Sequence, residues 1–164
     1  MQSENVFTPD EHYNRGVALM ERGHGAEGFE HLSRAYLADP QSASFRSAYA
    51  LGLALVRGQF LGAVELARAA VRDEFYNPSL YLNLARIYNT FGFKAEAIRY
   101  LKRGLMVEPG NGDLQVALSE FGMRRRPPIR FLPRGHMLNR MLGRIQARLI
   151  STSGRLAASS AQGA

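Results

Sequence analysis

The sequence contains no cysteine. Thiolate metal ligands and a cysteine nucleophile are therefore excluded, and a reducing compartment fits this composition. The four histidines, His12, His24, His31 and His136, do not provide the i and i+4 spacing of a helical metal site. Neither a P-loop nor a Ser/His/Asp pattern is recognisable. We expect a protein without a metal, a cofactor or enzymatic activity.

Long apolar segments are missing as well. The longest uninterrupted run of apolar residues and glycine, Ala48 to Val56, has nine residues, whereas a membrane-spanning helix needs about 20. The N-terminal stretch MQSENVFTPDEH is polar and acidic, and no apolar run precedes Val17. A secretory signal is therefore not expected, and we expect a cytoplasmic protein.

Acidic residues end at Glu120, although the chain continues to Ala164. Residues 1–122 carry 12 basic and 14 acidic side chains, whereas residues 123–164 carry nine arginines and no acid. The net charge of +7 therefore comes from the C-terminal part. Such a division predicts a nearly neutral folded body followed by a basic arm.

The stretch from Asn77 to Pro109 shows the pattern of two short amphipathic helices joined at Phe91-Gly92-Phe93. Apolar residues recur at helical spacing in each half. The pattern consists of Tyr81, Leu84, Ala85 and Tyr88 in the first helix, Ala97, Leu101 and Leu105 in the second, and the closing Pro109. This spacing closely resembles a tetratricopeptide repeat (TPR), with Tyr81 in place of the usual Trp and Ala85 in place of a Gly.

The resemblance extends over about residues 9–109. Residues 9–42 match the stretch at a shift of 69 residues, for example at Pro9 and Gly23, and form a degenerate first repeat. Residues 43–77 form a weaker middle repeat, whose loop glycine is Gly58. The resemblance implies an all-α fold, a right-handed α-α superhelix (TPR solenoid) of three repeats plus a capping helix and a C-terminal basic amphipathic helix.

These features predict the organisation of the whole chain. We expect a disordered N-terminus at residues 1–8 and a TPR domain at 9–122. Its repeats lie at about 9–42, 43–77 and 78–111, and its capping helix at 112–122. An Arg/Pro-rich strap is expected at 123–135, a basic amphipathic helix at 136–150 and a disordered tail at 151–164.

The helix from about Ser44 to Arg57 is apolar nearly all round. A surface helix would show a polar stripe, so this helix is predicted to be covered on both faces. In the TPR family the first helix of each pair lines the concave groove, which implies that a partner segment lies there. By the family's pattern the groove residues are Tyr13, Val17 and Met20, then Phe45, Ala48, Gly52 and Leu55, then Leu82, Arg86 and Asn89.

TPR domains that hold a chaperone's C-terminal carboxylate need a Lys/Arg and Asn set spread over three repeats. Only Arg86 and Asn89 resemble that set here, and Tyr13 and Val17 take the places of the first-repeat Lys and Asn. An apolar helix or extended peptide that packs against Phe45 and Leu55 suits this groove better.

Three interpretations of the basic arm stay open. The strap and helix dock back on the solenoid, or the arm binds an anionic membrane surface, or it binds nucleic acid or an acidic protein. Nucleic acid is less favoured because the arm has one aromatic residue, Phe131, for base stacking. The arginines concerned are Arg124, Arg125, Arg126, Arg130, Arg134, Arg140, Arg144 and Arg148.

Taken together, the sequence predicts a small cytoplasmic scaffold, similar to short bacterial TPR adaptors, that binds a peptide or helix of a partner protein in its groove. The alternative is a peripheral membrane-associated or nucleic-acid-associated protein that acts through the basic arm. Loss of partner binding on Phe45→Glu would favour the groove. Loss on removal of residues 123–164, with strong weakening by salt, would favour the arm.

Overall fold

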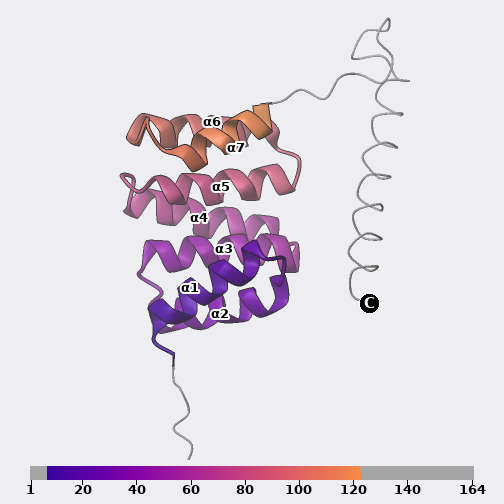
Figure 1. The fold of residues 1–164 in the computed structure, drawn as a ribbon, viewed down its shortest axis with the longest axis vertical. Coiled ribbons are helices and arrows are strands. Elements are labelled where there is room, and N and C mark those ends of the chain that lie inside the picture. Colours follow the sequence, from indigo (N-terminus) through magenta and orange to yellow (C-terminus); the bar gives the residue numbers. More distant parts are fainter. Residues whose placement is uncertain (1–6, 123–164) are drawn as a thin grey trace, which may run out of the picture. The chain divides into compact units, whose positions relative to one another are not determined.

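A computed structural model of the chain describes residues 7–122, and within them the chain forms α-helices and no β-strand (Figure 1). The predicted strap, basic helix and C-terminal tail, with all nine arginines of residues 123–164, lie outside the described residues, as do residues 1–6. The helices are α1 (Pro9–Glu21), α2 (Gly25–Ala38), α3 (Ala43–Arg57), α4 (Phe60–Asp73), α5 (Pro78–Thr90), α6 (Lys94–Val107) and α7 (Gly112–Gly122).

The first six helices form three consecutive pairs. Helix α1 packs mainly on α2, α3 on α4, and α5 on α6, while α3 also contacts α2 and α5 on either side of its own pair. The last helix, α7, packs on α6 and α5, and Figure 1 shows the pairs following one another in sequence order. This arrangement confirms the predicted all-α solenoid of three helix pairs and a closing helix.

The start of the first helix is held by a capping box. The Thr8 hydroxyl accepts a hydrogen bond from the Glu11 backbone N–H at 3.3 Å, and the Glu11 carboxylate accepts one from the Thr8 N–H at 2.7 Å. These hydrogen bonds lower the pKa of Glu11. Phe7 lies edge-on to the rings of His12 and His31. Residues 7 and 8, which the sequence placed in a disordered N-terminus, therefore belong to the folded body.

The turn inside each helix pair contains a glycine in the left-handed region. The φ angles are 86° at Gly23, 67° at Gly58 and 84° at Gly92, a conformation that a side chain disfavours. The three glycines lie 34 or 35 residues apart along the sequence. The same turn thus recurs once per repeat, as the sequence period predicts.

Helices α1 and α2 cross so closely that a Cβ atom does not fit at the crossing point. A Cβ placed on Gly28 would lie 2.9 Å from both the Gly16 carbonyl oxygen and the Met20 backbone nitrogen. The corresponding residue of the third repeat is Ala97, which is fully buried. Glycine rather than alanine at position 28 of the first repeat therefore has a structural reason, the close contact of α1 and α2.

The core is concentrated in the second and third pairs. The largest fully buried side chains are mostly leucines and an isoleucine from α5, α6 and α7. In α4 the small residues Ala63, Ala67 and Ala70 are fully buried and let this helix pack closely on its neighbours. The fully buried large apolar residues are Leu80, Leu84, Ile87, Leu101 and Leu114.

Candidate binding surfaces

Three of the predicted groove residues lie in the core. Phe45, Ala48 and Leu82 are only 8%, 3% and 8% exposed. The Tyr13 ring lies 5.3 Å from the Phe45 ring, so α1 itself covers part of α3. A charged substitution at Phe45 would therefore disturb the core of the protein as well as any groove.

The apolar circumference of α3 is explained by the helices around it. α3 packs on α2, α4 and α5, and more weakly on α1. On the side toward α2, a Cβ on Gly52 would lie 2.6 Å from a ring carbon of Phe29, and Phe29 stacks on Tyr49. Gly52 thus faces α2, and the inference that a partner must cover α3 does not hold. Most of the helix is covered, but by its own chain, and Leu55 near its C-terminal end stays accessible.

The remaining predicted groove residues are accessible to different degrees. Tyr13, Val17 and Met20 of α1 are half-buried. Leu55 of α3 is 49% exposed, and the α5 residues Arg86 and Asn89 are exposed.

Leu55 and Asn89 occupy equivalent places in consecutive repeats, 34 residues apart, on helices that pack against each other. Arg86 lies one turn before Asn89 on α5. Repeat equivalence thus puts one accessible apolar side chain on α3 and two exposed polar side chains on α5, at corresponding positions of helices that pack together. Within residues 7–122 the ion pairs join Arg34 to Glu30 and Arg46 to Asp73, so Arg86 is not neutralised by either.

An aromatic cluster at the ends of α4 and α5 was not predicted. The ring centroid of Phe60 lies 4.8 Å from that of Phe93, 4.9 Å from that of Phe91 and 5.9 Å from that of Tyr88. The sequence pattern indicates only a turn at Phe91-Gly92-Phe93. These residues also close the contact between the second and third pairs, and the signal for this role is the aromatic residue on each side of the turn glycine.

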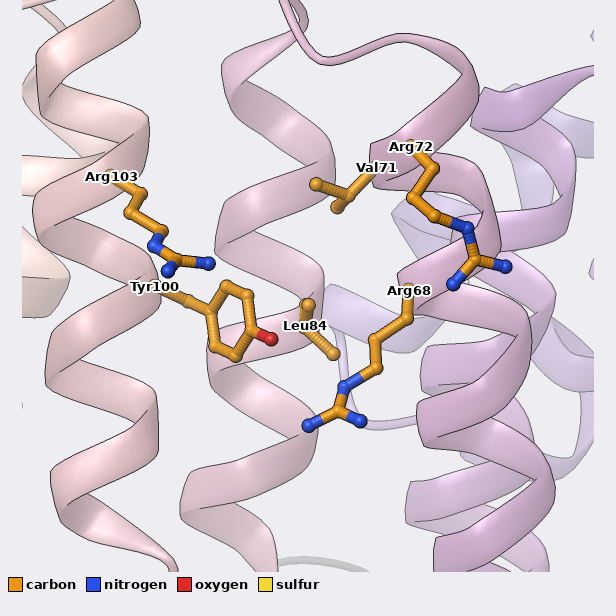
Figure 2. A pocket seen from close by; sticks show the side chains of 6 residues that line it. All are labelled: Arg68, Val71, Arg72, Leu84, Tyr100 and Arg103. Carbon is orange, nitrogen blue, oxygen red and sulfur yellow. The ribbon is translucent and has the colours of Figure 1, made fainter.

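A cleft between α4 and α6 was also not predicted (Figure 2). It has a volume of about 260 Å³, and Leu84 of α5 forms part of its floor. Three arginines and a tyrosine contribute to its wall, and none of its lining residues is acidic. The lining residues are Arg68, Val71, Arg72, Leu84, Tyr100 and Arg103, which we call the arginine cleft.

The tyrosines beneath the arginine cleft are packed ring on ring. The Tyr88 and Tyr100 centroids are 5.5 Å apart with nearly parallel planes. Arg68 lies 5.8 Å above the Tyr88 ring, and Arg99 and Arg103 lie 5.6 and 5.5 Å from the Tyr100 centroid. Burial raises the pKa of the Tyr88 hydroxyl, and the positive charge of Arg68 partly opposes this.

A second cleft, of about 520 Å³, lies between α2 and α4. Its lining includes the acidic Glu65 as well as Arg46, which is ion-paired with Asp73, and Arg72, which also lines the arginine cleft. Its charges are therefore mixed, unlike those of the arginine cleft. The other lining residues are Tyr36, Pro40, Gln41, Gly62, Leu66 and Ala69.

Two of the four histidines meet between α1 and α2. The Nδ1 atoms of His12 and His31 are 2.8 Å apart, so one nitrogen donates a hydrogen bond and the other accepts it. Desolvation lowers the pKa of His31, and the neighbouring His12 and Arg15 add to this effect. Within residues 7–122, no three side chains of metal-binding type gather at one point. The His12–His31 contact joins α1 to α2.

Gly23, Gly25 and Gly28 have the GxGxxG spacing of a dinucleotide-binding loop. That loop requires a β-strand before it and a helix after it. Here the three glycines connect and pack two helices, α1 and α2. The motif is therefore a turn and a close helix contact.

No family model matches the sequence, and no curated protein matches it. Solved structures of TPR proteins do match its fold. The first TPR of Spaghetti (RPAP3), bound to the HSP90 peptide SRMEEVD, has a TM-score of 0.54 and 18% identity over 70% of this chain and 90% of its own. The Arabidopsis OM64 TPR domain has a TM-score of 0.55 and 17% identity over 69% of this chain and 93% of its own.

A bacterial structure matches as well. TTC0263, a thermophilic TPR protein of Thermus thermophilus, has a TM-score of 0.61 and 19% identity over 70% of this chain and 64% of its own. At these identities the similarity shows a shared fold alone. Within residues 7–122, each helix is too short or too polar to cross a lipid bilayer.

Proposed function

We propose that this chain, which has the TPR fold, is a non-enzymatic cytoplasmic scaffold that binds a segment of a partner protein across α3 and α5. The observation that carries the proposal is the accessibility of Leu55 on α3 and of Arg86 and Asn89 on α5, the first helices of consecutive pairs that pack on each other. A large apolar residue flanked by polar groups can anchor a peptide and fix its orientation. The RPAP3 domain of the same fold was solved with a bound peptide, which supports this class of function.

The three side chains would act differently on such a segment. Leu55 would bury an apolar side chain of the partner. The guanidinium of Arg86 would bind a carboxylate, and the amide of Asn89 would hydrogen-bond the partner's backbone. Phe45 and Leu82 would act beneath them as support, because both are buried.

Leu55→Glu tests this proposal with little risk to the fold. Proteins captured from a cell lysate by the full-length chain are identified, and the affinity of the purified partner is then measured by calorimetry. We expect Leu55→Glu to weaken that affinity at least about tenfold, the effect of losing one anchor residue. The matched control is Leu61→Glu, because Leu61 is 81% exposed on α4, and this change should leave the affinity within about twofold.

The same affinity measurement distinguishes partner binding on the face of α3 and α5 from partner binding through the basic arm. Removal of residues 123–164 should leave the partner's affinity unchanged if the proposal is right. If that truncation abolishes binding while Leu55→Glu does not, and if binding weakens steeply with salt, the protein acts through its arm on an anionic surface, nucleic acid or acidic partner. The nine arginines of these residues are the observation that favours this second candidate.

A further inference from the structure

The arginine cleft combines a concentrated positive charge with an apolar floor. Arg68 and Arg72 follow one another at i and i+4 on α4, and Arg103 reaches the same cleft from α6 (Figure 2). Like charges at this spacing repel one another. An anionic ligand between them would relieve that repulsion.

The arginines of the cleft are positioned but not neutralised. Arg68 lies on the Tyr88 ring, and Arg103 lies on the Tyr100 ring, which limits the number of conformations their side chains adopt. Within residues 7–122, both ion pairs of the structure lie elsewhere, at Arg34 and Arg46. Neither Arg72 nor Arg103 takes part in these ion pairs, so both can donate to the carboxylates of a ligand.

The floor and wall indicate which kind of anion fits. Val71 is apolar and only half-buried, and it lies beside the edge of the buried Tyr100 ring, above the fully buried Leu84. A bare inorganic anion would leave these surfaces unused, whereas a glutamate or aspartate beside an apolar residue would contact both parts. The basic arm has no acidic residue, so it offers no such side chain to the cleft.

We propose that the arginine cleft binds an acidic segment of a partner protein, with separate carboxylates at Arg72 and at Arg103 and an apolar side chain over Val71. This site is separate from the proposed peptide-binding face of α3 and α5. It uses side chains of α4 and α6, the second helices of their pairs, whereas Leu55, Arg86 and Asn89 belong to the first helices.

The test uses the full chain and a fluorescein-labelled synthetic peptide in which glutamates alternate with leucines. Its affinity is measured by fluorescence anisotropy, and a peptide with glutamine in place of glutamate serves as the uncharged comparison. We expect the double variant Arg72→Gln/Arg103→Gln to weaken binding at least about tenfold. Arg72→Lys/Arg103→Lys keeps the charge but loses the planar fork, and should cause a smaller loss.

Arg22→Gln/Arg57→Gln is the matched control, because it removes the same charge at exposed sites outside the cleft. This control measures how much the affinity falls when two positive charges are removed away from the cleft while the basic arm is kept. It should change the affinity less than about twofold. Circular dichroism of each variant checks that it is folded. Leu55→Glu should leave this peptide's affinity unchanged, so the cleft and the face of α3 and α5 can fail independently.

Three results would overturn the proposal. Equal losses in the cleft variant and its control would show general electrostatic attraction. A loss with Arg86→Gln but not with Arg72→Gln/Arg103→Gln would place the acidic segment on the face of α3 and α5. Binding of phosphatidylserine vesicles that depends on Arg72 and Arg103, without binding of the glutamate peptide, would identify a membrane headgroup as the ligand.

Discussion

Single glycines determine how closely the first two helices approach. Gly28→Ala should lower the free energy of unfolding by about 1–3 kcal/mol, because the added methyl group would lie 2.9 Å from backbone atoms of α1. Backbone atoms cannot move aside as a side chain can. Urea denaturation of the full chain measures the change.

A second glycine provides the control for this substitution. A Cβ on Gly62 would have its nearest neighbour at 3.7 Å, in ordinary contact with Leu53. Gly62→Ala should therefore leave the stability unchanged or raise it by up to about 1 kcal/mol, since alanine favours the helix. Equal losses in both variants would contradict the explanation by close contact.

The His12–His31 pair gives the stability a pH dependence. The folded chain holds His31 neutral more strongly than the unfolded chain does, because its pKa is lowered. The unfolded state therefore binds more protons as the pH falls past the ordinary histidine pKa of 6.5, and the free energy of unfolding decreases with falling pH.

The stabilisation that comes from the lowered pKa of His31 is fully present above pH 6.5 and is lost as the pH falls below it. Thermal melts between about pH 8 and about pH 5 measure it. His31→Gln should flatten the dependence, while His24→Gln, at an exposed helix start, should retain it. A wild-type dependence that survives in His31→Gln would show that other groups cause it.

At the scale of the helix, the capping box of α1 should protect the N-terminal end of the solenoid. Thr8→Ala removes an acceptor of a backbone N–H and should cost about 0.5–2 kcal/mol. The matched control is Thr90→Ala, because the Thr90 hydroxyl donates to the Arg86 carbonyl within α5 and caps no helix start.

Hydrogen exchange localises this effect. Amides of α1 should exchange faster in Thr8→Ala than in Thr90→Ala, while amides of α5 and α6 should keep their protection. Uniformly faster exchange throughout the chain would indicate that α1 does not open separately from the other helices.

Helix positions were predictable because local signals coincide with tertiary ones. The turn glycines and the prolines at the first turns mark boundaries that the structure retains. The groove was predicted less well. Phe45 and Leu82 have the residue type of an apolar binding surface, but helical periodicity cannot distinguish a side chain covered by a partner from one covered by a neighbouring helix.

The arginine cleft was not predicted from the sequence, for a related reason. Arg68 and Arg72 on α4 look like an ordinary solvated helix face, and so does Arg103 on α6. Their charges gather only because α5 holds α4 and α6 on either side of Leu84. The spacing along each helix is local, whereas the distance between the helices depends on how the pairs stack.

At the scale of the molecule, each helix pair is stabilised by the pairs on either side of it. The second pair has no closing proline and few motif residues, yet it forms a regular helix pair whose first helix, α3, packs on both adjoining pairs. A repeat with a weak sequence signature is thus fixed by the repeats beside it.

The left-handed turns at Gly23, Gly58 and Gly92 have a practical consequence. Nothing within 4 Å would obstruct a Cβ at any of them, and their repeat equivalence places them at regular intervals along the solenoid. Spectroscopic labels or short epitopes inserted beside these glycines would therefore lie at regular intervals. Distances between the labels would report extension or compression of the solenoid without disturbing its proposed binding surfaces.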